Sequence, residues 1–330
     1  MGTTTSYFSA LSDLYHWYNL YSTRKYVEQF SNGVSIISIY LNQVPGATFS
    51  SKVPPIEHSI HQIIKEASLI YVLPENPFFK PALSGTAEPE STSPAVQEAT
   101  YAFIAWVFCQ HFCNRLGQAY QALRKVLDET DGQHAAILDD IKKRFREDAF
   151  TRQSILEVID AHPDLIRLLY VHFANVHYPA GSPHGDLTPT LSYQRLVQEE
   201  VLTDAQMLER IRKVAVNAHE RAVLETILLF NKAVLKTNFY AVQHKVALSF
   251  RLDPRFLPEV EYPYTPYGIF FVVGSDFRGF HCRFKDVARG GIRIVRSRNR
   301  ENYSINQRML FDEVYALAYT QQQKNKVSNL

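Results

Sequence analysis

Hydrophobic side chains change their spacing several times along the first 72 residues. A helical face is predicted first, from Leu11, Leu14, Tyr15, Tyr18, Tyr21 and Tyr26. Asn32-Gly33 interrupts this pattern, and the β-branched run 34–41 predicts a strand. Pro54-Pro55 breaks the chain before a second helical face, made by Ile60, Ile63, Ile64, Ala67 and Ile70. One strand and two helices cannot close a sheet, so we expect these residues to form part of an α/β module.

The middle of the chain is predicted to be a linker followed by helices. Residues 81–98 are rich in Pro, Ser and Glu and poor in apolar side chains, which is typical of a flexible linker. From residue 101 to residue 238 the spacing is helical almost throughout. The first helix is expected to run from 101 through Tyr120, and the last ones over 193–214 and 219–237. Thr151 is an expected N-cap, and Pro163 an expected first-turn residue.

The last part of the chain returns to a strand pattern. Segments 245–252, 269–273 and 279–285 are rich in β-branched and aromatic residues, and prolines separate the first two. A final helix is expected around Leu310, Val314 and Leu317. The predicted fold class is α+β: a mostly helical region that includes a small α/β piece, followed by strands and one helix.

The composition indicates a globular protein rather than a nucleic-acid-binding or membrane protein. A hydrophobic content of 46% is typical of a globular chain, and a net charge of +2 argues against general nucleic-acid binding. The longest apolar run, 101–108, is too short to cross a bilayer, so we expect no membrane partner. Gly2 and Ser6 fit a myristoylation pattern, but no Lys or Arg precedes Arg24, so we expect neither an acyl anchor nor a mitochondrial targeting segment.

Cysteines and histidines do not form a metal-binding pattern. The chain has three cysteines, Cys109, Cys113 and Cys282, too few for a disulfide framework in 330 residues. We expect buried free thiols and a reducing compartment. His172, His177 and His184 are spaced so that no two share a helix face, and we expect them in loops or on the surface.

The strongest chemical signal is a basic segment near the C-terminus. Residues 278–300 contain eight Lys or Arg and one acidic residue, Asp286. Arg289 and Arg293 flank Gly290-Gly291, where the missing side chains would let an anion approach the backbone and arginine would bind a carboxylate or phosphate. The residues alone leave three interpretations open: a small-anion site, a surface for nucleic-acid phosphates, or a solvated strand edge.

The amino-acid sequence around this basic segment resembles that of a known enzyme family. FRGFHCRFKDVARGGIRIVRS and LFDEVYALAYTQQQKNK resemble the large NAD-specific glutamate dehydrogenases, above all the fungal type. The resemblance is dense over residues 217–326. It is looser in YSTRKYVEQFSNGVSIISIYL and FCNRLGQAYQAL.

The resemblance implies an activity and a domain order. The family oxidises L-glutamate to 2-oxoglutarate and ammonia with NAD, as a homo-oligomer when complete, in the cytoplasm or the mitochondrion. We therefore expect an ACT-like regulatory piece in 1–80 and a helical region in 99–240. The start of the catalytic substrate domain is expected in 241–330, with an oligomer contact along its strands.

The resemblance also assigns candidate substrate-binding residues. Arg289 stands where the small dehydrogenases of the superfamily have the lysine that holds a substrate carboxylate. A second cationic group is expected from Lys324 and Lys326. The candidate set is Arg289, Gly290, Gly291, Arg293, Lys324 and Lys326, with Arg283 as a supporting residue. Asp312 and Glu313 are expected to fix the helix or the arginines rather than act as bases.

The resemblance also implies that part of the enzyme is missing from these 330 residues. After Lys326 the chain leaves the family pattern, and the family's catalytic lysine, catalytic aspartate and NAD-binding domain would lie further on. No Gly-x-Gly-x-x-Gly occurs among the 330 residues. We therefore expect a fragment that binds no NAD, carries no catalytic residue and is inactive alone. The alternative is a non-enzymatic module that binds anions or nucleic acid through the basic segment.

Overall fold

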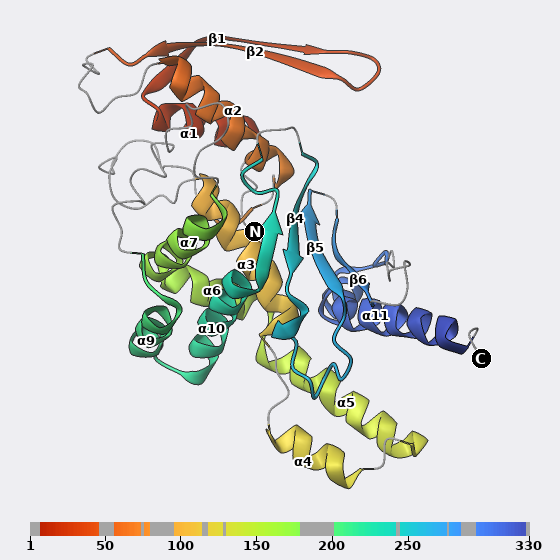
Figure 1. Cartoon of the computed structure of the whole chain (residues 1–330). Helices are drawn as coiled ribbons and strands as arrows, with labels where there is room; N and C mark the ends of the chain where they lie inside the picture. The colour runs from red at the N-terminus through yellow and green to blue at the C-terminus, as the bar shows by residue number, and fades with distance from the viewer. Residues whose placement is uncertain are drawn as a thin grey trace.

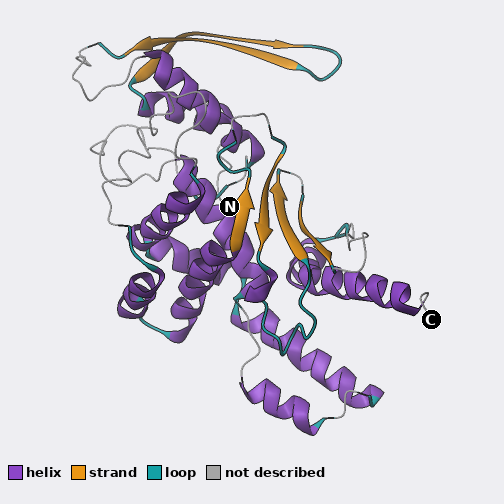
Figure 2. Cartoon of the chain, in the orientation of Figure 1, coloured by secondary structure: helices purple, strands orange, loops and turns teal. Residues whose placement is uncertain are grey.

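A computed structural model describes residues 7–45, 56–73, 76–79, 96–113, 118–127, 130–178, 201–241, 245–275, 277–284 and 295–327. Its helices and small antiparallel sheets confirm the α+β class (Figures 1 and 2). A long hairpin and two helices form the N-terminal part. Further helices and a four-stranded sheet make up the rest of the described chain.

The N-terminal part contains α1 (Tyr7–Trp17), β1 (Leu20–Gln29), β2 (Ser35–Gln43) and α2 (Ile56–Val72). The prediction of a helical face as far as Tyr26 was wrong. The helix ends at Trp17 because Asn19 takes a left-handed conformation (φ 56°), and residues from Leu20 onward pair with β2. Gly33 also takes a positive φ (84°), and Asn32-Gly33 forms the turn of a hairpin. This hairpin joins β1, which was not predicted, to β2, which was predicted as the strand 34–41.

Seven helices follow in the described part of the middle region. They are α3 (Val96–Phe112), α4 (Gln118–Val126), α5 (Gly132–Ala149), α6 (Arg152–Ala161), α7 (Pro163–His177), α9 (Asp204–Val214) and α10 (Ala218–Ala233). The Thr151 cap is confirmed, since its side chain accepts a hydrogen bond from the Ser154 amide (3.1 Å), and Pro163 begins α7. The single helix expected through Tyr120 is two helices, and α3 already includes the last three residues of the expected linker.

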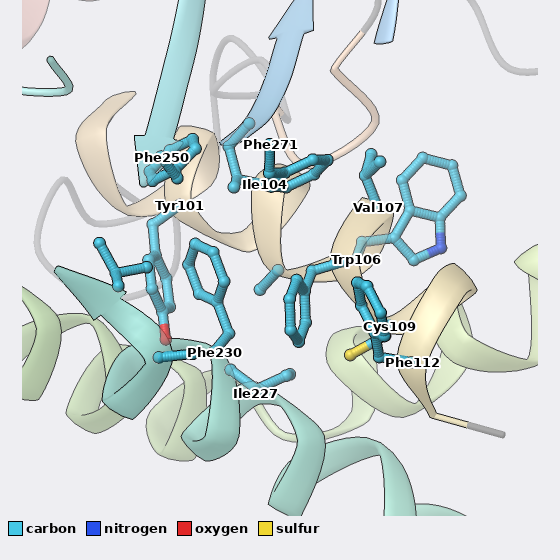
Figure 3. Close-up of a cluster of buried hydrophobic side chains, with 14 of the residues drawn as sticks. Tyr101, Ile104, Trp106, Val107, Cys109, Phe112, Ile227, Phe230, Phe250 and Phe271 are labelled. Atoms are coloured by element: carbon cyan, nitrogen blue, oxygen red, sulfur yellow. The ribbon is translucent and has the colours of Figure 1, made fainter. Parts of the chain in front are cut away.

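Helix α3 is the centre of the larger core. It is apolar on every side, and a helix of this kind must be surrounded by other elements. Figure 3 shows Tyr101, Ile104 and Val107 of α3 in one cluster with Ile227 and Phe230 of α10 and with the sheet residues Phe250 and Phe271. The Phe108 ring is 5.0 Å from that of Phe230 and 6.2 Å from that of Phe271. The helical region and the C-terminal sheet therefore share one hydrophobic core.

The second sheet has the order β3-β4-β5-β6, all antiparallel. Its strands are β3 (Val234–Thr237), β4 (Ala247–Leu252), β5 (Gly268–Gly274) and β6 (Arg278–Arg283), with a 3-10 turn at Pro254–Phe256. β3 was expected to be the end of a helix. Helix α10 ends at Ala233 instead, because the next residues pair with β4 along its open edge.

The final helix, α11 (Arg300–Val327), covers β6 and also contacts α3 (Figure 1). Phe311 packs its ring 5.1 Å from Phe280 of β6 and 5.0 Å from Phe112 of α3. The predicted C-terminal helix is confirmed and is fixed in the same core as the strands.

Candidate functional site

The candidate site lies where the chain passes from β6 to α11. Arg289, Gly290, Gly291 and Arg293 belong to segment 285–294, outside the described residues. Lys324 lies on α11 and is exposed, and Lys326 lies on the same helix, where only its backbone is described. The structure therefore places both ends of the basic segment, and the grouping of these six residues stays a prediction.

Both ends of the segment are held against the same core. Before it, Phe284 is buried, and its ring lies 5.7 Å from that of Tyr315 and 5.9 Å from that of Tyr319. After it, the Asn306 side chain donates to the Ser297 hydroxyl (3.0 Å) at the start of α11. The two ends therefore contact different parts of α11: Phe284 packs on the middle of the helix, and Ser297 is bonded near its start.

Arg283, the expected supporting residue, is the last residue of β6. Its guanidinium carbon lies 5.4 Å from the centre of the Tyr267 ring, which is a cation–π contact. Among the described residues no carboxylate lies within ion-pair distance of Arg283. Its positive charge is therefore not neutralised by an acidic side chain in the described part of the chain.

His281 lies on β6 two residues before Arg283. Burial lowers the pKa of His281, and the charge of Arg283 lowers it further. The imidazole is therefore biased toward its neutral form beside the cationic segment. It adds no positive charge near neutral pH.

Two further arginines, Arg278 at the start of β6 and Arg152 of α6, also contact aromatic rings. The guanidinium of Arg152 lies 4.9 Å from the Trp106 ring and 5.7 Å from the Tyr303 ring. Arg278 lies 5.9 Å from the same Tyr303 ring, so one aromatic side chain contacts two arginines. Sequence analysis missed Arg152, which is distant in sequence from the basic segment and belongs to α6.

Asp312 of α11 makes a contact of the kind expected for it, whereas the expected role of Glu313 stays a prediction. Asp312 accepts a hydrogen bond from the hydroxyl of Tyr262. One turn later, the Tyr315 hydroxyl donates to the Tyr264 carbonyl (2.8 Å) and accepts from the Tyr264 amide (3.1 Å). These contacts fix segment 262–264 on α11, which is a structural role for Asp312.

Lys245 is a buried cation that the sequence pattern did not reveal. It is 9% exposed, and its ammonium donates to the carbonyls of Asn238 (3.2 Å), Phe239 (3.0 Å) and Ala241 (2.8 Å). Burial lowers the pKa of Lys245 to about 8, while the three carbonyls stabilise the charged form. The residue closes the connection between β3 and β4 and lies in the interior rather than at the site.

The cysteine prediction is confirmed for all three thiols, which are buried and unbonded to one another. Burial raises the pKa of Cys282 to about 12 and the pKa of Cys109 well above its usual value. Both thiols therefore stay protonated and unreactive at neutral pH.

The histidine prediction needs a correction for two positions. His172 and His177 lie on α7 rather than in a loop, and His184 is outside the described residues. His172 contacts Asp204 (2.9 Å) and Asn231 (3.3 Å), so it joins α7 to α9 and α10. Within the described ranges no cluster of three or more His, Cys, Asp or Glu could hold a metal ion, and no helix could cross a membrane.

The described residues do not fit a dinucleotide site of the usual kind. That site uses a parallel sheet, with a glycine-rich turn between a strand and a helix. All four strand pairings of the described sheets are antiparallel. We therefore assign no NAD contact to the described part of this chain.

Two family models match the chain. Residues 1–84 match the second domain of NAD-specific glutamate dehydrogenase, and residues 206–328 match the catalytic domain of the bacterial NAD-glutamate dehydrogenase. No solved structure matches.

Curated relatives match almost the whole chain. It is 53% identical over 98% of its length to the NAD-specific glutamate dehydrogenase of Neurospora crassa, and 41% identical over 98% to that of Saccharomyces cerevisiae. It is also 42% identical over 98% of its length to glutamate dehydrogenase 2 of Dictyostelium discoideum. The chain spans 30%, 30% and 29% of these relatives, respectively.

Proposed function

Because this chain belongs to the family of NAD-specific glutamate dehydrogenases, we propose that it supplies the substrate-binding part of such an enzyme. The substrates would be L-glutamate and 2-oxoglutarate. The observation that carries the proposal is 53% identity over 98% of the chain, a span that includes the basic segment between β6 and α11. The cofactor would be NAD, bound by residues outside the described part of this chain.

The proposed role of the site is to hold a dicarboxylate. Such a substrate needs two separated cationic groups, because each fixes one carboxylate and together they orient the Cα hydrogen. Arg289 would bind one carboxylate, with Gly290 and Gly291 allowing close approach and Arg293 beside them. Lys324 and Lys326 would bind the other. Arg283, at the start of the segment, supports this assignment, because its guanidinium contacts the Tyr267 ring and no carboxylate among the residues that the structure describes.

The proposed domain functions follow the same family. Residues 1–80 would form an ACT-like regulatory piece, 99–240 a helical region, and 241–330 the start of the substrate domain. Of the linker expected over 81–98, only 81–95 is still proposed, because α3 begins at Val96. The complete protein would be a homo-oligomer. The shared core of α3 and the C-terminal sheet supports a mechanical connection between the last two regions.

The test is Arg289→Ala in a complete dehydrogenase that contains this chain. Loss of a charge-assisted contact is worth roughly 1.5–3 kcal/mol, or about 10–150-fold in kcat/KM for glutamate. The KM for NAD should stay unchanged. Arg298→Ala is the matched control, because Arg298 is an exposed arginine of the same basic segment. Unchanged glutamate kinetics in Arg289→Ala would refute the assignment.

A further inference from the structure

The N-terminal hairpin extends away from the helices that support it (Figure 1). Only its base is covered: Ile39 and Leu41 pack against the cluster formed with α1 and α2, and Lys25 donates to Ser12 of α1 (2.9 Å). The opposite face carries exposed apolar side chains, with Tyr26 at 50% and Tyr40 at 57%. A two-stranded hairpin alone is marginally stable in water, and exposed apolar patches often mark interaction sites. We therefore expect the exposed face of this hairpin to bind a partner.

Both outer edges of the hairpin are open in the described part of the chain, because its sheet contains β1 and β2 alone. The Phe30 amide donates to the Val34 carbonyl (2.8 Å), which makes Phe30 and Val34 a hydrogen-bonded pair. Hydrogen-bonded and non-hydrogen-bonded pairs alternate along an antiparallel ladder. Lys25, Val27 and Gln29 therefore direct their backbone N–H and C=O groups toward the open edge of β1.

The charges of β1 are self-complementary in one register. If β1 pairs antiparallel with β1 of a second copy about Tyr26, then Lys25 faces Val27 of the other copy in a hydrogen-bonded pair. In the same register Arg24 faces Glu28 of the other copy, twice by symmetry. The two neighbouring registers that also form hydrogen bonds between the strands lack the Arg24–Glu28 pairs. One places Lys25 opposite Lys25, and the other leaves Arg24 opposite Phe30.

The side chains of this register fall on the exposed face. Residues opposite each other on β1 and β2 share a face, so Arg24 lies beside Tyr40 and Glu28 beside Ile36. The rings of Tyr26 and Tyr40 already meet edge to face at 6.0 Å. We propose that two copies of this chain associate through β1 centred on Tyr26, forming a four-stranded antiparallel sheet with two Arg24–Glu28 pairs and a cluster of four tyrosines.

Charge reversal tests the register. The 330-residue chain is expected to dimerise in analytical ultracentrifugation, and Glu28→Arg alone or Arg24→Glu alone should raise the dimer dissociation constant at least tenfold. An equimolar mixture of the two variants should recover the dimer, because each Glu then faces an Arg of the other copy. Glu209→Arg on α9 is the control, since Glu209 is also exposed and is distant in sequence, and it should leave association unchanged.

A cysteine pair tests the geometry independently of any other contact between copies. Tyr26 faces its own equivalent in a non-hydrogen-bonded pair, where opposite Cβ atoms lie about 4.5–5.5 Å apart. Tyr26→Cys should therefore form an intermolecular disulfide on mild oxidation, whereas Ser38→Cys on β2 should not. The three native thiols are buried, so background crosslinking is low.

Three outcomes would overturn the proposal. They are a monomer at all concentrations, a dimer that survives both charge reversals, and a dimer in which Tyr26→Cys does not crosslink. The last two would place another surface at the interface. Failure of the Arg289 assignment has no bearing on these results, because the hairpin belongs to the N-terminal part.

Discussion

At the scale of single residues, the arginines near the candidate site contact aromatic rings. Arg283 contacts Tyr267, and Arg278 and Arg152 share Tyr303. Cation–π contacts hold a guanidinium in place without cancelling its charge. Arg283, held in this way, stays able to attract an anionic substrate.

The same contacts argue against nucleic acid as the partner. Single-stranded nucleic acid needs aromatic faces on which bases stack, and the rings of Tyr267 and Tyr303 are engaged by arginines. We expect no retained binding to single- or double-stranded oligonucleotides at physiological salt. A gel-shift assay that finds micromolar or tighter affinity, falling steeply with salt, would contradict this.

Lys245 provides a pH-dependent test of an interior contact. Its pKa of about 8 in the folded protein lies below the ordinary 10.5, so between these values the unfolded chain binds more protons than the folded one. Stability from this group therefore rises with pH across that window. Relative to Lys245→Met, the wild-type free energy of unfolding should increase by roughly 1–3 kcal/mol from pH 7.5 to pH 10.

Urea unfolding of both proteins at the two pH values measures this difference. Comparison with Lys245→Met cancels the titration of the tyrosines, which both proteins share. A wild-type free energy of unfolding that, measured relative to Lys245→Met, stays constant or falls as the pH rises would show that Lys245 is not buried as described.

At the scale of elements, α3 connects the helical region to the C-terminal sheet. Phe108 is fully buried and packs against Phe230 of α10 and Phe271 of β5. Phe108→Ala should lower the free energy of unfolding by about 3–5 kcal/mol, through lost burial and the cavity left behind. Phe277→Ala removes an exposed ring (54%) and should change it by less than about 1 kcal/mol. Comparable losses in the two variants would argue against α3 as the centre of the core.

The elements also show how far the sequence could predict the fold. Strand β5 was predicted as 269–273 and is found at Gly268–Gly274, because its apolar run is bounded by glycine and proline on one side and a glycine turn on the other. β1 was missed because its Tyr21 and Tyr26 were assigned to the same helical face as Tyr18. The residues of β1 form a strand because they pair with β2, which is not visible in their own spacing. β3 was missed because α10 runs into it without a break residue.

The candidate site was predictable only as a local motif. Arg289-Gly290-Gly291 can be identified from residue types and from the resemblance to the family. Arg152 and Lys245 could not be found in this way, because their partners are distant in sequence or are backbone carbonyls. Contacts of this kind depend on how distant parts of the chain pack, and the spacing of residues along the sequence does not predict that packing.

At the scale of the whole molecule, substrate binding and hydride transfer are separable. The described chain contributes a helical region and a four-stranded antiparallel sheet that share one core. Hydride transfer additionally requires a dinucleotide site that orients the nicotinamide ring toward the substrate. Neither the described strand topology nor a glycine-rich fingerprint in the sequence provides one.

We therefore expect the 330-residue chain to show no glutamate dehydrogenase turnover by itself. Loss of an acid–base group alone costs orders of magnitude in rate, and without a bound hydride acceptor the oxidation cannot proceed. The measurement is NADH absorbance with glutamate and NAD, using protein purified from a host strain that lacks its own glutamate dehydrogenase. The chain carrying Arg289→Ala is the control, because any true turnover should fall with that substitution. Turnover above background that responds to Arg289→Ala would show that these residues contain a complete active site after all.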